Sequence, residues 1–258
     1  MKTLKLFAAT GLVSASMLPF HSNAFAEDTA DMTIDEIIEQ AEAAEADLES
    51  FFKESVTTLT TGDDTSEIMV REWVRVTDDV TESRYEVHHA DNDIDVIVGD
   101  DTYAISYNEN EETAYEYYLP EDTDDDVDED TEDVIESIED LNAATMIETA
   151  LEFYDVTING TEELLDREAY YLTFVPNEEA ESDIEFDMWV DTEFYVILKQ
   201  QEIGEDYEFL LEVTEFEPNT DIEDDVFELE IPEGVEVIST GEGEGQDENE
   251  STDEEDEE

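Results

Sequence analysis

The sequence contains no cysteine, and only eight of its 258 residues are lysine or arginine. Without cysteine the chain can form no disulfide, and it lacks the acylated cysteine that anchors a bacterial lipoprotein. The scarcity of basic residues excludes nucleic acid as a partner, because phosphate backbones are bound through lysine and arginine. Anionic membrane surfaces are disfavoured for the same reason. We therefore expect the hydrophobic core alone to stabilise the fold.

Long hydrophobic runs are also missing, apart from an apolar stretch over residues 6–20. Lys2 and Lys5 precede this stretch, and the small-residue pattern of a signal peptidase site follows it and ends at Ala26. The stretch contains Pro19 and is shorter than the roughly 20 residues of a membrane-spanning helix. We expect residues 1–26 to be a signal peptide and the mature chain to be exported to the periplasm, cell wall or medium, without a transmembrane span or lipid anchor.

Acidic residues, in contrast, are abundant along the whole chain. Once the predicted signal peptide is removed, six basic residues stand against all 82 acidic ones. Two tracts are extreme, residues 121–133 and 239–258, but about three in ten residues elsewhere are acidic too. Such a charge destabilises a compact chain by self-repulsion unless salt screens it. We interpret it as adaptation to saline surroundings, as in a halophilic or haloalkaliphilic bacterium.

The composition predicts one folded domain with acidic appendages. Residues 27–238 have the size and apolar content of a single domain. Within them, residues 121–133 are too poor in apolar side chains to repay the cost of ordering, and we expect a solvated loop. Residues 239–258 consist mainly of glycine and acid, which predicts a disordered tail.

The domain opens with a pattern typical of an amphipathic helix. Thr33 and Glu36 have the spacing of a capping box, and Met32 and Ile37 can form the hydrophobic staple beside it. Apolar residues then recur every three or four positions and predict a helix that continues to Phe52, with this stripe: Ile34, Ile37, Ile38, Ala41, Ala44, Leu48, Phe51 and Phe52. A second helical segment is predicted over residues 141–154.

The remaining segments alternate with the period of two that is typical of strands. Turn residues separate them at hairpin spacing, and no helical crossover intervenes, so we expect antiparallel pairing. The fold class predicted from the residues is α+β, with about eleven strands curled over the helices. The strand segments are residues 55–62, 68–76, 84–90, 93–99, 102–107, 113–120, 154–160, 162–176, 183–191, 194–203 and 207–219.

The stretch 186–203 carries apolar side chains on both faces of a predicted strand pair. We expect a strand, a turn at residues 191–193, and a second strand from Phe194. Alternation would then place Phe194, Val196 and Leu198 on one face and Tyr195, Ile197 and Lys199 on the other. Because one face must meet the helices, we expect residues 226–238 to cover the second face.

Residues typical of catalysis are scarce. The adjacent pair His88 and His89 would point to opposite faces of a strand, and no nucleophile elbow, phosphate-binding glycine loop or zinc motif is present. Paired carboxylates could serve in catalysis, but so many acids make any pairing uninformative. We therefore predict a protein that is not an enzyme and needs no cofactor.

Calcium binding by the acidic loop is an alternative role for that tract. Aspartates occupy every second position from Asp122 to Asp130, as in an EF-hand loop. Val127 stands where that loop needs glycine, however, and Asp133 where it needs a bidentate glutamate. Loose cation binding fits the tract better, and a metal-buffering acidic surface protein remains an open alternative.

From residue 100 onward, four motifs in order resemble the LolA-like superfamily of lipoprotein carriers and lipoprotein-sorting proteins. They are "GDDTYAISYNENEETAYEYYLP", "INGTEELLDREAYYLTFVP", "DMWVDTEFYVILKQQEI" and "VTEFEPNTDIEDDVFELEIPEGVEVI". The resemblance implies an incomplete antiparallel β-barrel wrapped around the helices, with an apolar cavity that accepts acyl chains. The chain departs from the pattern at Asp166, where the family often has glycine before the arginine.

The resemblance also turns apolar positions into candidates for lipid binding, although each could equally be packed core. The candidates for the cavity or its lid are Ile37, Ile38, Val70, Val74, Val96, Tyr103, Ile105, Tyr117, Met146, Ile147, Leu151, Leu172, Met188, Val190, Phe209 and Leu211. The function so implied is an exported carrier or chaperone for the acyl chains of a lipid or lipoprotein. The alternative is an envelope sensor of the same fold that acts by binding a protein partner.

Overall fold

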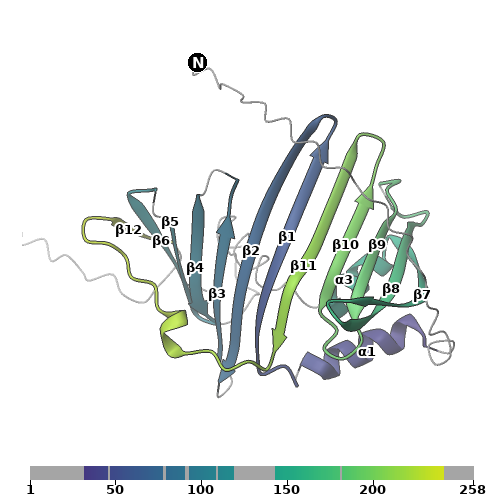
Figure 1. Ribbon diagram of the computed structural model, residues 1–258, viewed down its shortest axis with the longest axis horizontal. Helices are drawn as coiled ribbons and strands as arrows, with labels where there is room; N and C mark the ends of the chain where they lie inside the picture. Colours follow the sequence, from purple (N-terminus) through teal and green to yellow (C-terminus); the bar gives the residue numbers. More distant parts are fainter. Residues whose placement is uncertain are drawn as a thin grey trace, which may run out of the picture.

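The computed structural model describes residues 32–45, 47–77, 80–90, 93–108, 110–118, 143–180 and 182–240 (Figure 1). The predicted signal peptide and the acidic loop at residues 121–133 lie outside the described residues, as does the tail beyond Thr240. The roles predicted for these segments therefore stay predictions.

One twelve-stranded sheet forms most of the described structure. Neighbouring strands are antiparallel except for the last, β12, which runs parallel to β6. The order across the sheet is β12-β6-β5-β4-β3-β2-β1-β11-β10-β9-β8-β7, so β12 and β7 form its two edges and the sheet stays open. This confirms the predicted fold class, with one strand more than expected. The strands are β1 (Ser50–Thr61), β2 (Asp64–Thr77), β3 (Val80–His88), β4 (Ile94–Asp100), β5 (Tyr103–Asn108), β6 (Thr113–Tyr118), β7 (Tyr154–Leu164), β8 (Arg167–Pro176), β9 (Phe186–Asp191), β10 (Ile197–Ile203), β11 (Tyr207–Pro218) and β12 (Glu236–Thr240).

Helix α1 (Ile34–Glu45) begins where the sequence predicts. The Thr33 backbone N–H donates to the Glu36 carboxylate over 2.8 Å, and the Glu36 N–H donates to the Thr33 hydroxyl over 3.3 Å, which is the expected capping box. The prediction that this helix continues to Phe52 is wrong. Phe51 and Phe52 lie in β1, where they pair with β2 and β11, and two flanking strands outweigh a helical pattern of side chains.

Both longer helices lie at one end of the sheet, near β7, β8 and β9 (Figure 1). Helix α3 (Ala143–Leu151) contacts α1 and β7, within the segment predicted to be helical. No helix among the residues described is long and apolar enough to cross a membrane. The helices and strands enclose one cluster of buried residues: Ile37, Ile38, Ala41, Ala44, Ala143, Ala144, Ile147, Tyr170, Leu172, Phe174, Met188, Val190 and Tyr195. We call it the helix cluster.

A second buried cluster involves the other face of β8 and β9. Ala169 and Trp189 alternate with helix-cluster residues along these strands, so they point away from the helices. They pack with Leu198 and Val213, and the Trp189 ring stacks on Tyr171 at 4.8 Å between centroids. Both faces of β8 and β9 are therefore buried, which explains the apolar residues on both sides of the stretch 186–203.

Within that stretch, the turn is longer than predicted. Strand β10 begins at Ile197, and Tyr195 has a φ of 56°, so the expected strand alternation from Phe194 to Val196 is wrong. The Asp191 carboxylate accepts the N–H groups of Glu193 and Phe194 over 3.0 and 2.7 Å, and this side-chain turn replaces strand pairing. Ile197 packs against the helix cluster and Leu198 joins the second cluster, on opposite faces as predicted.

The predicted cover for the second face, residues 226–238, lies elsewhere. The short helix η1 (Asp224–Phe227) contacts β3, where Arg84 donates to the Val226 carbonyl over 3.2 Å. The chain then reaches β6 and pairs with it as β12. The prediction that this segment covers β9 and β10 is wrong, because two arginines hold it at the other half of the sheet; the second, Arg75, donates to the Asp224 carboxylate over 2.8 Å.

Candidate ligand-binding face of the sheet

Eight of the sixteen candidate residues converge on the helix cluster. Five of these eight are fully buried, each with 0% exposure, which describes a packed core. The rings of Phe174 and Phe186 add to this packing by stacking at 4.2 Å between centroids. This end of the sheet is filled by the side chains of the protein itself. The eight residues are Ile37, Ile38, Met146, Ile147, Leu151, Leu172, Met188 and Val190.

Strand register shows which residues farther along the sheet share the face that carries the helices. Met188 pairs with Gln200, which pairs with Leu211. Leu211 pairs with Thr57 of β1, which pairs with Ile68 of β2. Because paired residues point to the same side, all of them belong to one face, which we call the helix face.

The helix face continues across β2 to β6 as a largely apolar surface. None of its residues in these strands belongs to the helix cluster, and the apolar residues named below have intermediate exposure. The main contacts of α1 and α3 are with each other and with β7, at the opposite end of the sheet. We call this surface the far half of the helix face. Its apolar residues include Ile68, Val70, Val74, Tyr85, Val87, Ile97, Tyr115 and Tyr117.

The other candidates divide between the two faces. Val70, Val74, Tyr117 and Phe209 lie on the helix face. Leu211 of β11 is on this face by its register, but it packs against the second cluster. Val96, Tyr103 and Ile105 lie on the opposite face, so the sixteen residues cannot line a single cavity. A strand pattern gives the alternation but leaves open which set faces the helices. The lipid-binding role of each residue stays a prediction.

A buried ion pair, which the sequence analysis missed, lies on the helix face beside these apolar residues. Lys53 Nζ lies 2.6 Å from Glu72 Oε2, and the side chains are 9% and 2% exposed. Glu72 Oε1 is also buried, and the Tyr85 hydroxyl interacts with the same carboxylate. Burial, together with the Glu72 carboxylate, raises the pKa of Tyr85, which pairs with Glu72 across β2 and β3. The one signal of this ion pair in the sequence was Lys53 itself, because lysine is rare in this chain and β1 contains no other basic residue.

The other five basic residues in the described part of the chain lie on the opposite face. Each of the five is next to a helix-face residue along its strand, or it pairs across the sheet with a residue that points away from the helix face. All five are ion-paired, so the described residues offer no free cation for a phosphate or carboxylate ligand. The pairs are Arg71 with Glu54 (2.9 Å), Arg75 with Glu82 (2.7 Å), Arg84 with Glu86 (2.8 Å), Arg167 with Asp191 (2.6 Å) and Lys199 with Glu212 (3.3 Å).

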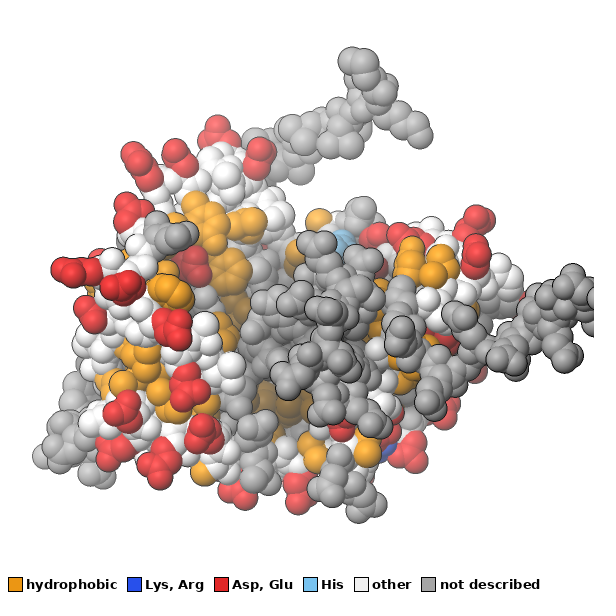
Figure 2. Space-filling model, turned by 180° about the vertical axis from the view of Figure 1, so that it is seen from behind, with side chains coloured by type: hydrophobic (Ala, Val, Ile, Leu, Met, Phe, Trp, Pro, Cys, Tyr) orange, Lys and Arg blue, Asp and Glu red, His pale blue; other side chains and the backbone are white. Residues whose placement is uncertain are grey.

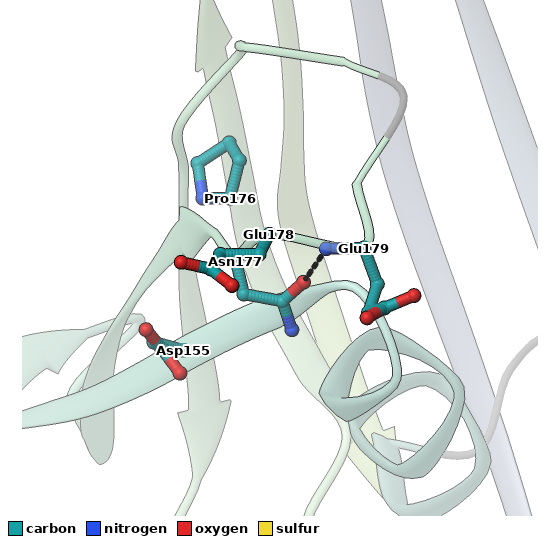
Figure 3. Close-up of a pocket in the computed structure, with 5 residues that line it drawn as sticks. All are labelled: Asp155, Pro176, Asn177, Glu178 and Glu179. Atoms are coloured by element: carbon teal, nitrogen blue, oxygen red, sulfur yellow. Dashed lines mark hydrogen bonds between the residues drawn. The ribbon is translucent and has the colours of Figure 1, made fainter.

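A shallow pocket of about 630 Å³ lies where β8 ends near β7 (Figure 3). Its lining is acidic, and one internal hydrogen bond, from the Glu179 N–H to Asn177 Oδ1, measures 2.8 Å. Within the described ranges, no three histidine, aspartate or glutamate side chains are arranged to hold a metal ion. The pocket therefore suits neither an acyl chain nor a metal. Its lining residues are Asp155, Pro176, Asn177, Glu178 and Glu179.

The two histidines of β3 and the following loop lie in separate surroundings. His88 Nε2 lies 3.4 Å from the Glu86 carboxylate, and His89 Nε2 lies 2.7 Å from the Asp95 carboxylate. Among the described residues, neither histidine hydrogen-bonds to a hydroxyl or thiol group that it could activate as a nucleophile. The pair provides no catalytic arrangement.

No family model and no curated protein matches the sequence. Solved structures that the fold matches include a LolA superfamily protein from Nitrosomonas europaea, at 11% identity over 77% of this chain and 98% of that one, with a TM-score of 0.35. The Mycobacterium tuberculosis lipoprotein LppX matches at 11% identity over 74% and 99%, with a TM-score of 0.41. The MucA/MucB complex from Pseudomonas aeruginosa matches at 14% over 75% of this chain and 61% of that one, with a TM-score of 0.45. With every TM-score below 0.5, these matches carry no argument about function.

Proposed function

We propose that the protein is an exported, noncatalytic carrier or chaperone that binds the acyl chains of a lipid or lipoprotein on the far half of the helix face. The observation that carries the proposal is the row of half-buried apolar side chains on β2 to β6, in register on one face and beside a closed core. Each methylene buried there would contribute roughly 0.8 kcal/mol. The four LolA-like sequence motifs support the same function.

The face has the chemistry that acyl binding needs. Its one basic side chain, Lys53, is neutralised by Glu72, so the described part of the surface carries no unpaired cation. An open apolar sheet face binds in proportion to the apolar area it buries, so it discriminates little between chains that bury the same area. We therefore expect the protein to accept saturated and unsaturated chains of similar length with similar affinity.

Two valines on opposite faces provide the test. Val70→Asp places a carboxylate on the proposed binding face, whereas Val96→Asp places one on the opposite face, and both valines are half-buried in central strands. We expect Val70→Asp to weaken uptake of a fluorescent fatty acid at least about tenfold, because a buried carboxylate costs more than the 1.4 kcal/mol of a tenfold change. Val96→Asp should bind as the unchanged protein does.

Native mass spectrometry of the purified protein provides an independent measurement. Copurified lipid or lipopeptide would support the carrier function. A lipid-free protein that also fails to take up fluorescent fatty acids and lipopeptides would refute it. Circular dichroism of both variants separates loss of binding from loss of folding.

A second function, recognition of a protein partner as an envelope sensor, is favoured by the edge of the sheet. In the described structure β7 pairs with β8 on one side and with no strand on the other. A free strand edge can accept an extended segment of another protein. Recovery of one regulatory protein from envelope extracts, with no lipid bound, would favour this function over lipid transport.

A further inference from the structure

The open edge of the sheet at β7 bears on which kind of protein partner the molecule can bind, an inference that rests on the second function proposed above. β7 lies at one end of the sheet, and among the described residues only β8 pairs with it (Figure 1). An unpaired edge presents backbone N–H and C=O groups to other chains, and natural proteins usually protect such edges with charges or bulges. The two halves of β7 differ in this protection.

The second half of β7 carries both kinds of protection. Its pairing with β8 shifts between Ile158 and Thr161, at a β-bulge where Gly160 has a φ of 111°. A bulge bends the strand and interrupts its ladder of hydrogen bonds. Two exposed glutamates follow, Glu162 and Glu163. A further strand can therefore pair regularly with β7 only up to Ile158.

The first half, residues 154–158, contains no bulge and only one charge, Asp155. Tyrosine, valine, threonine and isoleucine occupy the other positions, and all four favour extended strands. Asp155 and Thr157 are exposed, whereas the residues that alternate with them are half-buried against the helix cluster. These residues are Tyr154, Val156 and Ile158. Figure 2, in which this end of the sheet is on the left, shows apolar side chains at the surface between acidic ones. The helix cluster thus has an apolar margin along an edge that is open to another strand.

We propose that residues 154–158 bind an extended segment of a partner protein as an additional strand, in which apolar side chains alternate with basic or hydroxyl ones. Paired side chains on neighbouring strands point to the same face and lie about 5 Å apart. The apolar side chains of the segment would therefore bury surface against Val156 and its neighbours at the margin of the helix cluster. Backbone hydrogen bonds would supply affinity, and the alternation would supply specificity.

Asp155 sets the position of the basic side chain. A residue paired with Asp155 would lie beside its carboxylate, and Asp155 also lines the shallow pocket at the end of β8 together with Glu178 and Glu179 (Figure 3). A long basic side chain at this position would face a pocket with three carboxylates, which would repel an acidic one. At the other edge of the sheet, β12 contributes no side chain to either buried cluster of the described residues, so a strand added there would extend no core.

Three fluorescein-labelled peptides of equal length test the proposal in molar salt, which screens the charge of the rest of the molecule. The first, Lys-Val-Thr-Val-Lys-Val-Thr, has the proposed alternation. The second replaces both lysines with glutamate, and the third is the first with every backbone amide N-methylated. By fluorescence anisotropy, we expect the first peptide to bind about threefold more tightly than the second, the effect of an exposed ion pair. It should bind at least about tenfold more tightly than the third, because N-methylation removes the hydrogen-bond donors.

Two charge reversals locate the site. Asp155→Lys and Glu67→Lys change the net charge equally, but Glu67 is exposed on β2, in the interior of the sheet. Asp155→Lys should reverse the preference, so that the glutamate peptide binds more tightly, and Glu67→Lys should leave the preference unchanged. Hydrogen exchange should slow at the amides of residues 154–158 when the first peptide binds and stay unchanged in β12.

Four results would overturn the proposal. Equal binding of the N-methylated peptide would show that the backbone of the ligand makes no strand pairing, and slower exchange in β12 alone would place the ligand at the other edge. A preference for lysine that survives Asp155→Lys would show that Asp155 does not select the basic side chain. If no peptide binds, strand addition is wrong. A regulatory protein recovered from envelope extracts would then leave the second function standing on a different surface, and its absence would refute both.

Discussion

Arg167 illustrates how a chain with few basic residues places each of them. Its guanidinium donates to both oxygens of Asp191, over 2.6 and 3.1 Å, and lies 5.3 Å from the centre of the Phe194 ring. Asp191 in turn accepts the backbone N–H groups that form the turn before β10. The Asp191 interaction also raises the pKa of Arg167 despite its partial burial. One cation thus supports a hairpin, a turn and an aromatic contact.

Replacing this arginine should therefore be costly. Arg167→Met leaves the Asp191 carboxylate, 1% exposed, without a counterion, and we expect a loss of about 3 to 5 kcal/mol in the free energy of unfolding. Lys199→Met breaks an ion pair whose glutamate is 50% exposed and should cost less than about 1 kcal/mol. Urea denaturation of both variants measures the difference; equal losses would contradict this account of Asp191.

Among the elements, the hairpin between β7 and β8 has turn residues that do not suit the conformation of the turn. Leu165 and Asp166 form a two-residue loop with φ values of 54° and 58°, the left-handed conformation at both positions. Such turns favour asparagine and glycine, because a side chain in this conformation costs about 1 kcal/mol. The resemblance to LolA-like motifs also led us to expect glycine at position 166. The aspartate found there strains the turn but leaves the pairing of β7 with β8 unchanged.

Asp166→Gly should accordingly stabilise the protein by roughly 0.5 to 1 kcal/mol. Gly62, with a φ of 62° in the loop between β1 and β2, provides the reverse control. No atom lies within 4 Å of the position that a Cβ would take there, so Gly62→Ala tests conformation alone and should destabilise by about 1 kcal/mol. Thermal melts of both variants measure the effects, and a lower melting temperature for Asp166→Gly would refute the assignment of strain.

At the scale of the whole molecule, charge repulsion should dominate the response to salt. The chain carries a net charge of −74, and each described basic residue is already ion-paired. Raising the salt concentration from about 0.1 M to about 1 M shortens the screening length from about 10 Å to about 3 Å. We expect the melting temperature at neutral pH to rise steeply over this range. A constant melting temperature would contradict the prediction of a halophilic protein.

How far the sequence predicts the fold differs between its elements. The start of α1 is local, because its capping box joins residues three positions apart, and the prediction is confirmed. Its end is not local: β1 takes Phe51 and Phe52 because β2 and β11 flank them, and β11 lies more than 150 residues away. The placement of residues 226–238 depends on Arg75 and Arg84 in the same way, through contacts that no neighbouring residue reveals.

The fold class, the strand periodicity and the acidic surface could be predicted before folding is considered, because they follow from local patterns and composition. Which candidates share a face depends on strand pairing, since alternation along a strand gives two sets of residues and pairing across the sheet selects between them. Strand pairing also brings Lys53 to Glu72 on the helix face. A lysine and a glutamate that lie far apart in the sequence become a buried ion pair only when folding places β1 beside β2.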